Sequence, residues 1–361
     1  MDTVQNYKCP CCGAPLIFNA NDGNLTCESC KNSFSVQDMQ QISEAEEHVN
    51  KESKYDWSKY TPREFKNNSQ TKLSSYTCPS CGAEITGDES LGATVCPYCG
   101  NGIVIQNSFE EAFLPDYIIP FKVDKKAAMG IFEEDFKKRP FLPDEFKNKK
   151  KIAEMSGVYV PFWMFDCDCD ASITYNAYKT SMWSDSDYDY VKTDHYKLYR
   201  NGSLGFANVP VDASEKVDNM YTEAVEPFDF NDAVDFNAAY LSGYLADKYD
   251  VSADDCIGRA NERIKISTED AFSSTCRDFE GVVTEKANIS FSDGKIRYAL
   301  LPVWMLNIKY MDKMYKFAIN GQTGKIVGEY PVDKSKKWKY FAKVFAISLA
   351  VCAVAGWLLY G

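Results

Sequence analysis

The sequence predicts a multidomain protein: two small N-terminal cysteine-rich β-ribbons, a duplicated α+β region whose antiparallel sheets are covered by helices, and a C-terminal single transmembrane helix. Three observations support this prediction. CxxC motifs occur four times before residue 100, similar strand and helix patterns recur in two halves of the middle region, and the last residues are almost all apolar. With 361 residues, 45% of them hydrophobic, the chain is long enough for two or three folded domains.

The segment CPSCGAEITGDESLGATVCPYCG holds two CxxC pairs separated by 14 residues. Zn²⁺ binds four ligands in a tetrahedron, and two CxxC turns joined by a short hairpin supply four thiolates with little strain. Gly82 and Gly100 follow the second cysteine of each turn, where a positive φ is favoured. Such a hairpin has almost no apolar core, so we expect the metal to hold it together. We predict a zinc ribbon over 76–108 with the ligands Cys78, Cys81, Cys96 and Cys99.

The same spacing occurs earlier, in CPCCGAPLIFNANDGNLTCESC, and makes an internal repeat of one structural unit. Cys11 is a spare thiol that can compete with Cys9 for the metal, and Lys31 stands where the other turns have glycine. Disulfides or a redox site are the alternative, but no thioredoxin-like pattern surrounds either pair. We predict a first zinc ribbon over 1–36, and therefore two Zn²⁺ ions in all, with the ligands Cys9, Cys12, Cys27 and Cys30.

Residues 37–75 are polar and charged; a short helix is expected to begin near Ser43, and most of the segment is predicted to form a linker between the ribbons. Beyond the second ribbon the chain reads as two α+β repeats, 115–212 and 221–332. Each repeat contains a similar apolar strand, YVPFWMFD at 159–166 and LLPVWMLNI at 300–308. The two halves are therefore expected to be copies of one unit.

The start of each repeat predicts a strand followed by a capped helix. A Pro-Phe pair stands at 120–121 and again at 227–228, and an aspartate that can cap an amphipathic helix follows each, Asp124 or Asp232. The connections are short and rich in turn residues, which favours antiparallel pairing. Asn-Gly sequences predict hairpins in YRNGSLG, after Tyr199, and in INGQTGKIVGEY.

The C-terminal residues predict a membrane anchor. A basic juxtamembrane collar at 333–340 precedes an apolar stretch at 341–361 that is long enough to cross a hydrocarbon core of about 30 Å. Lysines crowd the N-terminal side of this stretch and none follows it, so the positive-inside rule predicts a single-pass protein of the cell membrane with its bulk in the cytoplasm. No signal peptide is recognisable at the N-terminus. The lipid bilayer is thus one expected partner.

Charge and motif content narrow the function. The net charge is −12, and the segment from Tyr76 to Gln106 contains no Lys or Arg, which argues against binding nucleic acid. Nucleophile elbows, HExxH and dinucleotide fingerprints are absent from the sequence, which predicts no enzyme and no small-molecule substrate. A thiol or metal hydrolase built on Cys167, Cys169 and the neighbouring aspartates is a less favoured alternative, as is a nucleic-acid-binding zinc-ribbon protein.

The order of motifs resembles that of the YdjG-type bacterial proteins, which are often labelled TFIIB-type zinc ribbon-containing proteins or primosomal DNA helicases. The resemblance rests on the tandem CxxC ribbons, IPF, YVPFWMFD, VPVDAS, LLPVWML and NGQTGKIVG, and covers nearly the whole chain. It implies a non-enzymatic adaptor of the envelope-stress response that acts with a phage-shock-protein-A-like coat protein and a flotillin-like SPFH protein. The helicase label is not supported, because the chain has no nucleotide-binding motif.

Overall fold

The computed structural model describes residues 7–20, 22–60, 73–88, 93–99, 101–104, 107–108, 114–215 and 219–360. The chain forms two compact units. Unit 1 comprises Met1–Lys59, Phe165–Val209 and Ile257–Ile296, and unit 2 comprises Tyr60–Met164, Pro210–Cys256 and Arg297–Gly361. The predicted ranges 115–212 and 221–332 each contribute residues to both units.

Unit 1 begins with a three-stranded antiparallel sheet, β1 (Leu16–Asn19), β2 (Asn24–Cys27) and β3 (Ser33–Ser35). Helix α1 (Val36–Asn50) follows directly, and the Ser35 side chain caps it by accepting a hydrogen bond from the Asp38 N–H at 3.0 Å. Strand β4 (Tyr55–Trp57) then pairs in parallel with β15 (Glu280–Tyr310).

Helix α1 occupies the first part of the segment 37–75 and begins at Val36, whereas a short helix was expected only from about Ser43. Helix α1 forms there because Met39, Ala45 and Val49 are buried at helical spacing, although the segment is mostly polar. Strand β5 (Leu73–Thr77) overlaps the end of the predicted linker, and 61–72 lie outside the described residues.

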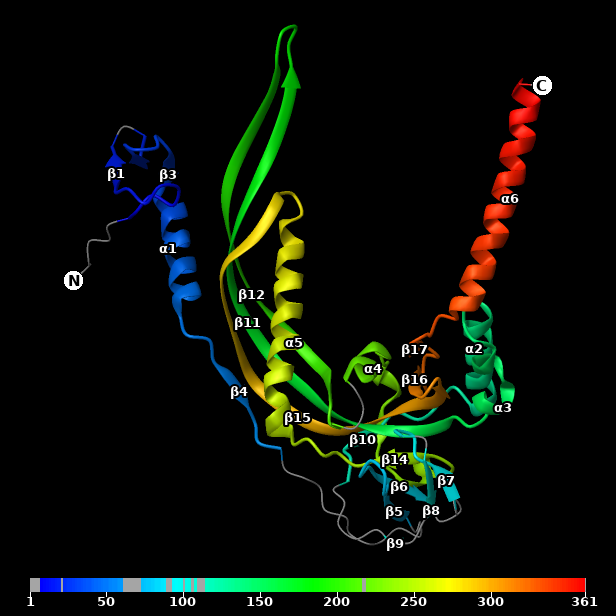
Figure 1. Cartoon of the computed structure of the whole chain (residues 1–361). Helices are drawn as coiled ribbons and strands as arrows, with labels where there is room; N and C mark the ends of the chain where they lie inside the picture. The colour runs from blue at the N-terminus through cyan, green and yellow to red at the C-terminus, as the bar shows by residue number, and fades with distance from the viewer. Residues whose placement is uncertain are drawn as a thin grey trace. The chain divides into compact units, whose positions relative to one another are not determined.

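The core of unit 1 lies between long strands and one helix. Strands β11 (Ser156–Ser184) and β12 (Asp189–Asp212) form a hairpin, and β11 also lies beside β15 (Figure 1). Helix α5 (Ala253–Ser273) contributes Ile264 and Phe272 to this core. Alternate residues of β11 point into it, because side chains alternate between the two faces of a strand: Cys167, Cys169, Ala171, Ile173, Tyr175 and Ala177.

In unit 2 the strands follow the order β13-β10-β15-β11-β14-β6-β5-β9. The pairs β10–β15 and β11–β14 are parallel, whereas β10–β13, β14–β6, β5–β6 and β15–β16 are antiparallel, so the prediction of antiparallel sheets was wrong. The parallel pairs join segments far apart in the sequence, which no short connection constrains. The remaining strands of this sheet are β6 (Glu84–Asp88), β9 (Asn107–Ser108), β10 (Tyr117–Ile118), β13 (Val234–Asp235), β14 (Leu245–Asp247), β16 (Lys313–Asn320) and β17 (Ile326–Gly328). Strands β7 (Ala93–Val95) and β8 (Gly102–Val104) form a separate two-stranded sheet.

The two similar apolar strands do not build separate sheets, because β11 and β15 are neighbours in one sheet. Their surroundings are nevertheless alike. The Trp163 indole donates to the Val251 carbonyl at 2.9 Å, and the Trp304 indole donates to the Val123 carbonyl at 2.8 Å. The Pro161 and Pro302 carbonyls likewise accept the N–H groups of Ala213 and Gly321, at 3.1 and 2.8 Å.

One of the two predicted helix starts is confirmed and the other is wrong. Asp124 caps α2 (Lys125–Lys137) by accepting the Ala127 N–H at 2.7 Å, as predicted. Helix α5 is capped by Ser252, whose hydroxyl accepts the Asp255 N–H at 3.2 Å, and the predicted cap Asp232 does not begin an α-helix. Asp232 instead lies in a short 3₁₀ turn and forms an ion pair with Lys122 at 2.5 Å. A Pro-Phe pair followed by an aspartate therefore did not identify a helix start in the second half.

One of the two predicted hairpins is confirmed. β16 and β17 pair antiparallel across the turn that contains Gly321. The other is wrong, because Asn201 and Gly202 lie inside β12, where a Cβ at Gly202 would come within 3.4 Å of the Phe272 ring. Glycine at 202 thus reflects close packing in a strand and not a turn.

The remaining helices are short, apart from the last one. They are η1 (Asp144–Lys147), α3 (Lys149–Ile152), α4 (Asn219–Ala224), η2 (Phe230–Asp232), η3 (Ala238–Leu241) and η4 (Ser274–Cys276). Helix α6 (Lys334–Tyr360) ends the described chain. Its segment Lys334–Ala355 is long and apolar enough to cross a membrane, and none of its most apolar window is buried in the protein.

Candidate metal centres

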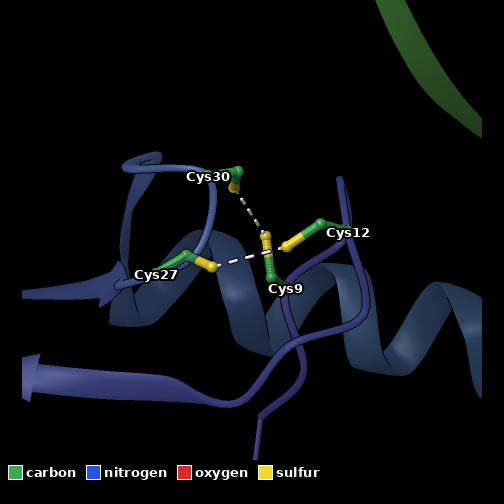
Figure 2. Close-up of side chains that lie close together, drawn as sticks. All are labelled: Cys9, Cys12, Cys27 and Cys30. Carbon is green, nitrogen blue, oxygen red and sulfur yellow. Dashed lines mark hydrogen bonds between the residues drawn. The ribbon is translucent and has the colours of Figure 1, made fainter.

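Within the described residues, two groups of side chains are arranged as metal ligands, and each consists of four cysteines whose Sγ atoms all lie within 4.8 Å of one another. In the first ribbon the Sγ atoms of Cys9 and Cys30 are 3.5 Å apart, as are those of Cys12 and Cys27 (Figure 2). In the second ribbon the corresponding distances are 3.6 Å for Cys78 and Cys99 and 3.7 Å for Cys81 and Cys96.

These distances fit a tetrahedral metal ion. Sulfur atoms at about 2.3 Å from a central zinc are about 3.8 Å apart along a tetrahedron edge. A disulfide requires about 2.05 Å, and all of these cysteines are free thiols. Both predicted ligand sets are thus brought together, and the two groups fit two Zn²⁺ ions.

The turns that carry the thiols are built alike. The N–H groups of Gly13, Lys31 and Gly82 each donate to the carbonyl of the first cysteine of their turn, at 2.8 to 2.9 Å. All three residues have a positive φ, of 74°, 64° and 72°. The glycine missing at Lys31 therefore does not change the turn, although a side chain at positive φ is strained. Gly100, in the fourth turn, lies outside the described residues.

Cys11 does not replace Cys9. Cys9 is buried within the first cluster, whereas Cys11 is exposed and is not a member of it. The order of the two residues in the turn decides this, because the first residue of a CxxC turn and the fourth face the same point. The question that the sequence left open is thus answered by the backbone.

Hydrogen bonds make one thiol in each ribbon easier to ionise. The Cys30 backbone N–H lowers the pKa of Cys27 to about 7. Burial raises the pKa of Cys78, but the N–H groups of Ser80 and Cys81 outweigh it and lower the pKa to about 7. Burial raises the pKa of Cys81 and, more strongly, that of Cys96. A bound cation would be required to keep these last thiols ionised together with their neighbours.

Four thiolates complete the coordination of zinc and leave no position for water or substrate. Catalytic zinc sites keep such a position open, so these two sites have the composition of structural ones. A Zn²⁺ ion with four thiolates carries a formal charge of −2. Near the second ribbon, the Lys248 ammonium group brings a positive charge to within 3.8 Å of the Glu84 carboxylate.

The second cluster is part of a larger core. Cys78, Cys96 and Tyr98 are buried with Val158 and Val160 of β11. Strand β6 of the ribbon pairs with β14, and the Asn307 side-chain amide donates to the Pro97 carbonyl at 2.7 Å. The packing of Tyr98 and the hydrogen bond from Asn307 were not predicted from the sequence. The aromatic residue inside CPYC was a usable signal, because the equivalent residue of the first ribbon is Ser29.

The thiols considered for a hydrolase are not at a site. Cys167 and Cys169 are buried in the unit 1 core, and burial raises the pKa of Cys167 to about 12. The Cys169 thiol instead faces the Thr268 hydroxyl at 3.5 Å. The neighbouring Asp166, Asp168 and Asp170 belong to the opposite face of β11. Within the described residues, these aspartates and the two cysteines form no metal-ligand cluster.

Comparison with known proteins gives one informative relative. YdjG, an uncharacterized protein of Bacillus subtilis strain 168, is 30% identical over 341 residues, which is 94% of this chain and 94% of the relative. No family model matches the chain. No solved structure matches it either.

Proposed function

The chain belongs to the YdjG family, and from this premise, its thiolate clusters and its apolar helix we propose that it is a non-enzymatic, zinc-binding adaptor held at a membrane. Its cytosolic part would position protein partners at the inner face of the cell membrane. The single observation that carries the proposal is the combination of two closed four-cysteine sites with one exposed apolar helix. The sites hold structure and leave no coordination position for chemistry, and the helix requires a lipid environment.

The orientation follows from the charges that flank α6. Lys334, Lys336, Lys337 and Lys339 precede the most apolar part of the helix, which by the positive-inside rule supports a cytoplasmic position for the units before it. Asp144 pairs with Lys336 at 2.6 Å, so the start of α6 is tied to unit 2. A reducing cytoplasm would keep the eight ligand thiols available for zinc.

The partners in this proposal come from the resemblance to YdjG-type proteins. They are a phage-shock-protein-A-like coat protein and a flotillin-like SPFH protein, and the process is the envelope-stress response. The cation-poor second ribbon supports a protein partner over nucleic acid, since phosphate binding depends on Lys and Arg.

We also infer that the middle region arose by duplication of a strand–helix–strand unit. The support is the recurrence of the tryptophan, proline and helix-cap hydrogen bonds around β11 and β15. When the two copies are aligned on these recurring hydrogen bonds, residues 118–124 correspond to 246–252. Breaking the two tryptophan bonds separately, with Trp163→Phe and Trp304→Phe, should destabilise unit 2 to a similar degree in chemical denaturation; a loss at only one position would argue against equivalence.

In-cell crosslinking followed by mass spectrometry tests the adaptor role. The full chain, a variant lacking α6 and a Cys27→Ser/Cys30→Ser variant are compared, with Cys11→Ser as the matched control. We expect loss of α6 to release the protein from membranes, the double variant to lose crosslinks to at least one membrane-associated partner, and Cys11→Ser to keep them. Identical crosslinks in all four proteins would contradict an adaptor that works through its ribbon and anchor.

The same proteins test the alternatives. Binding to DNA or RNA that weakens steeply with salt would favour the nucleic-acid function instead. A reaction abolished by Cys167→Ala with the fold intact would favour an enzyme, against the buried position of this thiol.

A further inference from the structure

The hairpin of unit 1 ends in a segment that lies at the surface. The end of β11 and the start of β12, residues 179–195, form what we call the hairpin arm, which continues past the start of β15 in Figure 1. No side chain of the arm is buried. A two-stranded ribbon without a covering layer is only marginally stable in water. An arm of this length is therefore expected to be stabilised by contact with another molecule.

The tip of the arm exposes large apolar side chains. Met182 is 75% exposed, Trp183 51%, Tyr188 69% and Val191 64%. The Trp183 ring stacks on that of Tyr190, with centroids 5.4 Å apart and planes 9° from parallel. Clustered exposed aromatic groups are typical of binding surfaces, where Trp and Tyr supply most of the affinity.

The turn between the strands holds these groups in place. The Asp185 carboxylate accepts hydrogen bonds from the N–H groups of Asp187 and Tyr188 and from the Tyr190 hydroxyl, at 2.8 to 2.9 Å. The Ser184 hydroxyl donates to Asp189 at 2.6 Å. The aromatic tip is therefore ordered before a partner arrives, which lowers the entropy lost on binding.

Charge selects the class of partner. From Met182 to Val191 the chain has three aspartates and no Lys or Arg, and Lys192 is paired with Asp194 at 2.8 Å. An anionic leaflet would be repelled by this tip. Lys and Arg side chains are attracted both to the carboxylates and to the faces of the aromatic rings.

We propose that the tip of the hairpin arm is the docking surface for a protein partner that presents a cationic amphipathic helix. The apolar face of that helix lies on Trp183 and Tyr188, and its Lys or Arg side chains reach Asp187 and Asp189. This inference rests on the proposed adaptor function and names its surface and the chemistry of its partner.

The test uses the full chain in phosphatidylcholine nanodiscs and a labelled amphipathic helical peptide of Leu and Lys, about 18 residues long. Fluorescence anisotropy gives the affinity for the wild type and for Trp183→Ser/Tyr188→Ser. We expect the variant to bind at least about 10-fold more weakly, as for loss of an aromatic hot spot. Ile17→Ser/Phe18→Ser, which removes equally exposed apolar groups from β1, should bind like the wild type.

A charge pair of variants separates specific from general attraction. Asp187→Asn should weaken binding, whereas Asp254→Asn, on α5, should not, and a peptide with Glu in place of Lys should not bind. Zinc content unchanged from that of the wild type shows that each variant is folded.

The proposal would be overturned if the arm variants and the control variants weakened peptide binding equally. It would also be overturned if the protein did not bind the peptide and its nanodiscs instead floated with phosphatidylglycerol vesicles, which would indicate a lipid-binding arm. If the arm variants bind the peptide normally while the in-cell crosslinks depend on the ribbon and the anchor, the arm proposal fails and the adaptor function stands. If the crosslinks are lost in none of the variants, the adaptor function fails as well.

Discussion

The two zinc ribbons share one ligand spacing but differ in what surrounds the metal. In the first, Cys9, Leu25 and Cys27 are the buried residues among those that the structure describes before α1, and β1 to β3 form a sheet of their own there. In the second, Cys78 and Cys96 belong to a cluster that includes residues of strands β11 and β15, and β6 continues the sheet of unit 2 through β14. The same motif thus serves once as a small module and once as a corner of a large core, so losing zinc should have different consequences at the two sites.

Removing one ligand from each ribbon should show the largest contrast. Cys27→Ser and Cys96→Ser should each reduce bound zinc from two ions to one, because a site with three thiolates binds more weakly. Structural zinc contributes on the order of 10 kcal/mol to folding. Hydrogen exchange should increase only before residue 36 in Cys27→Ser, but also in β6, β14 and the start of β11 in Cys96→Ser. Exchange confined to the ribbon in both variants would mean that the second ribbon is as separate as the first.

Truncating the aromatic residue of the second ribbon should have the next largest effect. Tyr98→Ala leaves a cavity in the unit 2 core and should lower the free energy of unfolding by about 3 to 5 kcal/mol. Ser29→Ala is the matched change in the first ribbon, where the side chain is exposed, and should be nearly neutral. Chemical denaturation followed by intrinsic fluorescence measures both. A loss under 1 kcal/mol for Tyr98→Ala would contradict the packing described.

The hydrogen bond that fastens the second ribbon to β15 should matter less. Asn307→Ala leaves the Pro97 carbonyl without its donor and should cost about 1 to 3 kcal/mol. The exchange of zinc for a chelator at the second site should become faster, while that at the first site stays the same. An equal change at both sites would show that the bond does not act on this ribbon.

The smallest effect is expected at the turn without glycine. Lys31→Gly relieves a side chain at φ 64° and should stabilise the first ribbon by a few tenths to about 1 kcal/mol, seen as slower zinc release. The reverse change in the second ribbon, Gly82→Lys, should speed release from its own site by a similar factor. No difference in either variant would indicate that the turn tolerates a side chain without strain.

Much of the metal chemistry could be predicted from spacing. Two CxxC pairs place four thiols around a point whatever the rest of the chain does, because the turn itself is short and closes on its own hydrogen bonds. The apolar C-terminal helix was predictable for a similar reason, since length and composition suffice. Helix α1 was predicted only as a short helix from about Ser43, because its three buried residues are scattered among charged ones and acquire meaning only from what they pack against.

The predictions for the middle region were wrong where strands pair with segments that are distant in the sequence. Tyr117 lies beside Ala299 and Val158 beside Leu245, and local turn residues carry no information on such partners. Cys167 and Cys169 alternate with aspartates, which indicates that they share one face of a strand, but periodicity cannot tell which face meets a helix. The glycine at 202 was likewise judged by its neighbours in sequence, while Phe272 of α5 is its neighbour in space.

The sequence by itself therefore determined the eight ligands, the two metal ions they fit and the helix that can span a membrane, because each depends on residues within one short segment. Only the tertiary structure decided that Cys11 stays outside its cluster, that the second ribbon is built into unit 2, and that an acidic aromatic arm projects from unit 1. These features depend on which distant segments exclude water from one another, and burial of that kind is a property of the folded chain.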